Sequence, residues 1–231
     1  MAYLATRSRS IGASADPAGL LLEATGPETS APSATAYESG STGHIMHILA
    51  IPGSLRASSI NAAFCRAAAR TAPADLSISV YERLGELPLF NPGREADLPA
   101  PVHVWRQAVR DCDALLIASP EYAHGVSGVM KNALDWLVSY EAFVGKPVAL
   151  VNTSPRAHHA YDGLLETLRT MSATVVESAS LNIPLLGSCP DEPAMLASEE
   201  VSTRIRLIVL ALRAYVLDPT GPGPSSPFEQ A

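Results

Sequence analysis

Short apolar runs that alternate with longer helix-type segments constrain the fold of this chain more than any other feature. The runs at 114–120 and 147–154 have the almost continuous apolar character of strands covered on both faces. Strands are expected at 46–51, 75–82, 114–120, 147–154 and 174–183, and helices at 60–71, 102–112, 128–140, 161–173 and 198–218. This alternation predicts an α/β fold in which helices cover both faces of one parallel sheet.

The segments outside this pattern differ in composition. Residues 1–43 are rich in Ala, Ser, Thr, Gly and Pro, and residues 219–231 in Pro, Gly and Ser, without a sustained helix or strand period. The sequence therefore predicts one folded domain over 44–218 between two disordered extensions. Because Met46 directly precedes the first convincing strand, we also hold the hypothesis that the natural chain starts there.

Charge and cysteine content narrow the class of protein. A formal net charge of −7 argues against binding to nucleic acids or to anionic membrane surfaces, which both need basic surface. No apolar run is long enough to span a bilayer. Cys65, Cys112 and Cys189 are widely spaced and form no CxxC pair, as in reduced cytosolic proteins. We expect a cytoplasmic protein with a small-molecule ligand.

Three polar loops follow expected strands, at 53–61, 119–128 and 152–159. In open parallel sheets, ligands bind beyond the carboxyl ends of the strands, at the point where the strand order reverses. The three loops are therefore expected to converge on one site.

The first of these loops carries more hydrogen-bond donors than a turn needs. Gly53 allows close approach of the backbone, and Ser54 and Ser59 offer hydroxyls. Arg56 offers a guanidinium, and Asn61 can cap the helix whose positive end favours an anion. These groups suit a phosphate monoester, and the absence of GxxxxGK[ST] and GxGxxG spacing leaves a mononucleotide. A capped turn with a solvated arginine is the alternative.

The second loop suits the edge of a flat heteroaromatic ring such as a flavin. Pro120 fixes the chain after the strand, Tyr122 and His124 can border a ring, and Gly125 allows backbone amides to lie against it. Glu121 is either a solvated charge or a partner for an arginine across a subunit boundary. An ordinary glycine-containing loop is the alternative for the whole segment.

Three motifs carry a resemblance to a known family. GSLRxxSxN at 53–61, LPLFN at 87–91 and SPEYxxGxxGxxKNALDW at 119–136 resemble the NADPH-dependent FMN reductase family, a flavodoxin-like group that includes chromate and quinone reductases and azoreductases. The resemblance covers residues 46 to about 185. It implies a three-layer sandwich around a five-stranded parallel sheet of order 2-1-3-4-5. It also implies noncovalent FMN, NADPH or NADH as electron donor, and homodimers or homotetramers.

The resemblance also implies roles for individual residues. The expected cofactor-binding residues are Ser54, Arg56, Ser59, Ile60, Asn61, Pro120, Glu121, Tyr122, Thr153 and Ser154. The expected substrate-facing residues are Asn91, His124 and Arg156, with Asn91 near the site of a partner subunit. The loop NTSPRAHHAY departs from the glycine-rich run of many relatives, and its Arg156, His158 and His159 could meet the phosphates of a nicotinamide nucleotide. A solvated loop is the alternative.

No Ser-His-Asp set, paired carboxylates or metal-ligand cluster is evident in these loops, so the chemistry is expected on the flavin and no catalytic side chain or metal is predicted. The expected function is an FMN-dependent NAD(P)H oxidoreductase. It would pass a hydride from NADPH to FMN and then to free flavin, a quinone, chromate or an azo compound, with ping-pong kinetics. A flavodoxin-like electron carrier, which usually lacks an arginine like Arg56, and a non-catalytic flavin-binding module are the alternatives.

Overall fold

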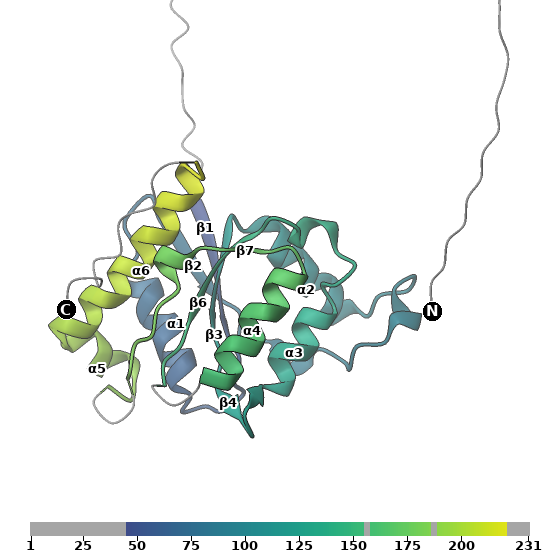
Figure 1. Ribbon diagram of the computed structural model, residues 1–231, viewed down its shortest axis with the longest axis horizontal. Helices are drawn as coiled ribbons and strands as arrows, with labels where there is room; N and C mark the ends of the chain where they lie inside the picture. Colours follow the sequence, from purple (N-terminus) through teal and green to yellow (C-terminus); the bar gives the residue numbers. More distant parts are fainter. Residues whose placement is uncertain (1–44, 155–157, 186–188, 221–231) are drawn as a thin grey trace, which may run out of the picture. The chain divides into compact units, whose positions relative to one another are not determined.

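The structure of the protein is a computed structural model that describes residues 45–154, 158–185 and 189–220 (Figure 1). These residues all belong to one compact unit. The expected disorder of 1–43 falls outside the described residues, as does most of the segment 219–231, so the predicted domain limits stay predictions. None of the helices in the described part of the chain combines the length and the apolar character that a bilayer crossing requires.

The main sheet is parallel and has five strands. They are β1 (Met46–Pro52), β2 (Leu76–Val80), β3 (Ala114–Ala118), β6 (Pro147–Val151) and β7 (Thr174–Val175), in the order β2-β1-β3-β6-β7. The strands β4 (Glu121–Tyr122) and β5 (Gly125–Val126) form a separate antiparallel hairpin. Counted within the main sheet alone, the order is therefore the predicted 2-1-3-4-5, and it reverses between β1 and β3.

Helices cover both faces of this sheet, which makes the expected three layers (Figure 1). The α-helices are α1 (Ile60–Thr71), α2 (Ala100–Asp111), α3 (Gly128–Asp135), α4 (His158–Thr170), α5 (Glu192–Ala197) and α6 (Glu199–Leu217). Four short 3-10 helices are η1 (Leu84–Glu86), η2 (Pro92–Arg94), η3 (Glu141–Phe143) and η4 (Glu177–Ala179). Helices α1, α5 and α6 lie on one side, and α2, α3 and α4 on the other.

Alternate residues of the central strands fill two separate hydrophobic clusters. Ile48 and Leu116 face the α1 and α6 side, whereas Leu49 and Leu115 face the side of α2, α3 and α4. Successive side chains of a strand point to opposite faces, so a strand covered on both sides needs an unbroken apolar run. The three cysteines are buried as free thiols, as their spacing predicts.

Several expected elements are shorter than predicted, and two of the differences have a clear physical cause. The helix expected over 128–140 ends at Asp135, where the carbonyl of Trp136 instead accepts from Arg106 Nε at 2.8 Å. The strand expected over 174–183 is interrupted after Val175, and parallel pairing returns only as an isolated bridge between Asn152 and Asn182. After Val175 the chain turns through η4, and the Ser180 side chain accepts from the Leu150 amide at 3.0 Å, in place of a backbone carbonyl.

Candidate functional site

The loops that follow β1, β3 and β6 meet at the carboxyl edge of the sheet, as the sequence predicts. Ser54 Oγ lies 3.5 Å from the hydroxyl of Tyr122, which joins the first loop to the second. Thr153 Oγ1 donates to Asn61 Oδ1 at 2.7 Å, which joins the third loop to the start of α1. The three segments therefore surround one region beside the β1/β3 reversal, the usual ligand position in such sheets.

Gly53 is required by the neighbouring strand β3. Its amide donates to the Ala118 carbonyl at 2.8 Å, so β1 and β3 stay paired up to this point. A Cβ at Gly53 would lie 2.4 Å from Ser119 Oγ and 2.8 Å from Ser119 Cβ, closer than real atoms approach. Only glycine fits here without moving the two strand ends apart.

The start of α1 differs from the prediction in its capping residue. Ser59 is the N-cap, and its Oγ accepts from the Ala62 amide at 3.3 Å. The expectation that Asn61 caps the helix was wrong, because Asn61 lies inside the first turn and is buried. The amides of Ile60 and Asn61 belong to that first turn, where backbone N–H groups have no partner within the helix. They are suitable donors for an anion.

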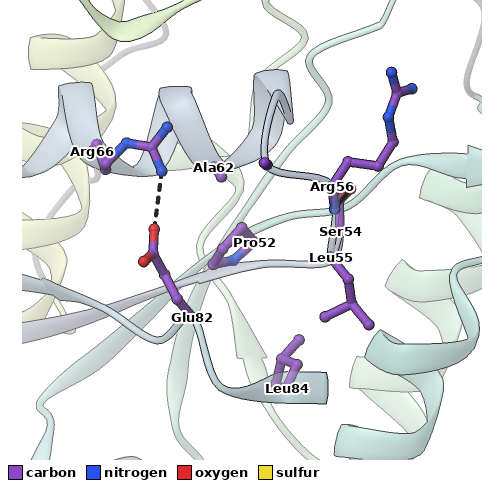
Figure 2. A pocket seen from close by; sticks show the side chains of 9 residues that line it. Pro52, Ser54, Leu55, Arg56, Ala62, Arg66, Glu82 and Leu84 are labelled. Carbon is purple, nitrogen blue, oxygen red and sulfur yellow. Dashed lines mark hydrogen bonds and ion pairs between the residues drawn. The ribbon is translucent and has the colours of Figure 1, made fainter. Parts of the chain in front are cut away.

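Arg56 is the cation of this loop that is available to a ligand. It is exposed, and no ion pair joins its guanidinium to another described residue. Figure 2 shows its side chain extending away from Arg66 and Glu82, which line the same cavity of about 280 Å³. Arg66 is already paired, with Glu82 at 2.9 Å and with Glu192 at 3.4 Å.

The hairpin of β4 and β5 has a strained two-residue turn. Ala123 and His124 both have positive φ angles, 51° and 59°. Two left-handed central residues are typical of a type I′ turn, which normally takes Asn or Gly. Ala and His are less suited to that conformation, and such strain is often found at ligand-binding sites. The turn holds Tyr122, half exposed, at the edge of the site.

Glu121 joins this hairpin to α4, so it is not the simple solvated charge that was one interpretation of the sequence; a pairing with an arginine of a partner subunit stays a prediction. Its Oε2 accepts from the Ala160 amide at 2.9 Å, and its Oε1 lies 3.1 Å from His124 Nδ1. The side chain is only 12% exposed, so the carboxylate is not simply solvated. The pKa of Glu121 lies below its ordinary value, chiefly because the Ala160 amide donates to the carboxylate.

This arrangement predicts a local pH dependence. Because the folded-state pKa of Glu121 is lowered, its stabilising effect is complete above the ordinary Glu pKa of about 4.3. It is lost as the pH falls through the lowered value. We expect hydrogen-exchange protection of the Ala160 amide to decrease over that acid range, in NMR spectra of the isotope-labelled protein. In Glu121→Gln this acid-dependent loss of protection should be absent. An unchanged loss in that variant would show that Glu121 is not the titrating group.

Three imidazoles gather beside this hairpin. The ring centroids of His124 and His159 lie 4.6 Å apart, and those of His158 and His159 lie 4.0 Å apart. No group of His, Cys, Asp or Glu side chains within the described ranges is arranged to hold a metal ion. Arg156 lies outside the described residues, so its expected role remains a prediction.

The other predicted site residues in the described part of the chain differ in burial and in their hydrogen bonds. Thr153 is buried, and its hydroxyl is engaged by Asn61. Ser154 is partly exposed, and its amide donates to Asn152 Oδ1 at 3.0 Å. Pro120 is partly exposed directly after β3. Asn91 is exposed, and its Oδ1 caps η2 by accepting from the Gly93 amide at 2.8 Å.

The LPLFN segment is held by hydrogen bonds with Asn132 and Trp136 that were not predicted from the sequence. Asn132 Oδ1 accepts from the Phe90 amide at 2.8 Å, and its Nδ2 donates to the Pro88 carbonyl at 3.0 Å. Trp136 Nε1 donates to the same carbonyl at 2.8 Å. The motif KNALDW therefore anchors LPLFN. The occurrence of both motifs in one sequence was the only feature from which this contact could have been predicted.

Comparisons with known proteins identify the family of this chain. The sequence profile of the family described as NADPH-dependent FMN reductase matches residues 46–185. A 2-hydroxy-1,4-benzoquinone reductase of Burkholderia sp. is 38% identical over 112 residues, which are 47% of this chain and 61% of that protein. An NAD(P)H-dependent FMN reductase of Pseudomonas aeruginosa is 39% identical over 110 residues, 46% of this chain and 59% of that protein.

Solved structures show the same fold. FerB, a flavoenzyme NAD(P)H:(acceptor) oxidoreductase from Paracoccus denitrificans, superposes with a TM-score of 0.62 at 22% identity, over 75% of this chain and 98% of that chain. The chain spans about three fifths of the length of the curated relatives above. The family match itself covers more than half of the present sequence. The chain belongs to the NADPH-dependent FMN reductase family.

Proposed function

We propose that this protein is an FMN-dependent NAD(P)H oxidoreductase that transfers electrons to a small-molecule acceptor. The observation that carries the proposal is the pairing, at the β1/β3 reversal, of an anion-binding loop with a hairpin that presents Tyr122. The family description and the name of the Pseudomonas aeruginosa relative support the same cofactor and electron donor.

The residues at the start of α1 fit the phosphate end of FMN. The first-turn amides, the hydroxyl of Ser54 and Arg56, which has no ion pair with another described residue, provide donors at this loop, and the helix dipole adds positive potential there. Ser59 contributes through its cap rather than through a free hydroxyl.

The hairpin fits the ring end of the cofactor. Pro120 and Tyr122 would border the isoalloxazine, and Glu121 would act indirectly, by holding the hairpin against α4. Bound FMN would supply the hydride chemistry, and the protein would orient the ring and leave one face open to both substrates in turn. The acceptor is proposed to be a quinone, free flavin, chromate or an azo compound, with quinones favoured by the names of several relatives.

We also propose that the protein forms homodimers or homotetramers in the cytoplasm. Leu89 of the LPLFN segment is 85% exposed, and Val138 and Val144 are also exposed beyond α3. Exposed apolar side chains of this kind are frequent at subunit interfaces. Asn91, close to Leu89, would then lie near the site of a partner subunit.

The purified protein is expected to be yellow and to bleach when NADPH is added without oxygen. With a quinone present, NADPH oxidation should be steady, and double-reciprocal plots at several quinone concentrations should be parallel, because both substrates use one face. Light scattering on the same sample measures the oligomeric state. Bleaching without steady turnover would instead favour an electron carrier, and a colourless protein that binds no FMN would refute the proposal.

A further inference from the structure

We propose that Thr153 is a positioning residue that fixes the side-chain amide of Asn61 so that its Nδ2, and not its Oδ1, is available to the phosphate of the cofactor. The inference rests on the proposed function, because it needs an anion at the start of α1. It assigns Thr153 an indirect role, in place of the direct cofactor contact expected from the sequence.

The geometry leaves one polar atom of Asn61 for a ligand. Thr153 Oγ1 donates to Asn61 Oδ1 at 2.7 Å, and the two residues are 2% and 3% exposed. A side-chain amide has an acceptor and a donor of nearly the same shape, so its orientation is decided by its hydrogen bonds. With Oδ1 occupied by the threonine hydroxyl, the NH₂ group is the one that can donate further.

Thr153 is held firmly on its own side. The Thr153 carbonyl accepts from the Leu185 amide at 3.1 Å. The preceding residue, Asn152, donates through its amide to the Leu181 carbonyl at 3.0 Å and accepts at its own carbonyl from Ile183 at 2.8 Å. The loop after β6 therefore cannot easily shift to present another atom to Asn61.

Asn61 is equally fixed on the α1 side. It is the second residue of α1, and the preceding N-cap, Ser59, sets the direction of the first turn. No buried side-chain nitrogen or oxygen in the described part of the chain lacks a hydrogen-bond partner. The bond thus joins two rigid segments, and losing its donor would leave a buried acceptor unsatisfied.

The orientation of the Asn61 amide matters because its NH₂ group and its carbonyl oxygen have opposite effects on an anion. An NH₂ group donates to a phosphate oxygen, whereas a flipped amide would present a carbonyl oxygen to it and repel it. Hydrogen bonds to charged groups typically change affinity by about 10- to 100-fold. Binding of the uncharged ring should be affected much less.

The test compares FMN with riboflavin, which lacks the phosphate. Apoprotein variants are titrated with each flavin, and quenching of flavin fluorescence gives the dissociation constants. Thr153→Val keeps the shape but removes the hydroxyl, and we expect about 10- to 100-fold weaker FMN binding with riboflavin binding nearly unchanged. Thr153→Ser keeps a hydroxyl and should restore most of the FMN affinity.

Two further variants make the result decisive. Asn61→Asp keeps an acceptor for Thr153 but replaces Nδ2 by an oxygen, so it should also weaken FMN binding selectively. Thr167→Val removes a hydroxyl that donates to the Gly163 carbonyl on α4 at 2.7 Å, and should change neither affinity.

The possible outcomes distinguish a failure of the positioning role of Thr153 from a failure of the proposed phosphate site. Equal losses of FMN and riboflavin binding in Thr153→Val, or no loss, would overturn the positioning role. Unchanged FMN affinity in Asn61→Asp would overturn it even if the valine variant did not fold. If the parent protein binds riboflavin as tightly as FMN, or binds neither, the proposed phosphate site itself is wrong.

Discussion

Replacing Ser54 and Arg56 together by alanine is expected to weaken FMN binding by about 100- to 1,000-fold. A charge-assisted bond from arginine to a phosphate contributes about 1.5–3 kcal/mol, and a serine hydroxyl adds about 1 kcal/mol. Among the described residues Arg56 has no ion pair, and Ser54 Oγ has only long contacts, 3.4 Å to the Arg56 amide and 3.5 Å to the Tyr122 hydroxyl. The loss should therefore appear in binding and not in stability.

Fluorescence titration of the apoprotein with FMN and with riboflavin measures this effect. Riboflavin affinity should change little, because the two side chains are assigned to the phosphate. Arg110→Ala is the matched control, since it removes the same charge from an exposed position on α2. Should the double variant bind FMN as tightly as its parent, the phosphate site and the proposed function that depends on it would both be wrong.

Gly53→Ala is expected to lower the free energy of unfolding by about 2–3 kcal/mol, the effect of overpacking between two paired strands. The added Cβ would meet Ser119 Oγ at 2.4 Å, and it would also lie 3.1 Å from Ser119 Cα. A rotation of the serine side chain relieves only the first contact. The ends of β1 and β3 would have to separate, which also weakens the bond from the Gly53 amide to Ala118.

Urea unfolding followed by circular dichroism measures this difference. Gly128→Ala is the matched control, because a Cβ at Gly128 would meet no atom within 4 Å. It should change stability by no more than about 0.5 kcal/mol. Adding Ser119→Gly to Gly53→Ala should recover part of the loss, and a Gly53→Ala protein as stable as its parent would show that the strand ends are not closely packed.

Local pattern was sufficient to predict most of the fold. The helix at 60–71 and the strand core at 114–118 were predicted from composition and period, and the helix expected from residue 198 is α6, whose N-cap Ser198 accepts from the Val201 amide. These features depend on neighbouring residues and on burial of both sheet faces, which the sequence displays directly. The order 2-1-3-4-5 came from the family resemblance instead.

The wrong or missing details depend on contacts between distant segments. The 128–140 helix ends early where Arg106, from another helix, binds the Trp136 carbonyl. Neither the solvated charge nor the arginine partner considered for Glu121 included its bond to the Ala160 amide, because that amide is 39 residues away. Asn61 was expected to cap its helix, but its side chain is taken by Thr153, 92 residues later. Such pairings are decided by tertiary packing, which no local window contains.

The packing of α1 against α6 has a consequence for how the chain is made. Phe64 and Ala67 of α1 share one hydrophobic cluster with Ile205 and Leu212 of α6, although α6 is synthesised long after α1. Until α6 leaves the ribosome, that face of the sheet remains incompletely covered. Sequence-distant contacts of this kind slow folding and expose apolar surface in the meantime. We therefore expect a chain that stops before α6 to expose apolar surface and to aggregate more readily than the full chain.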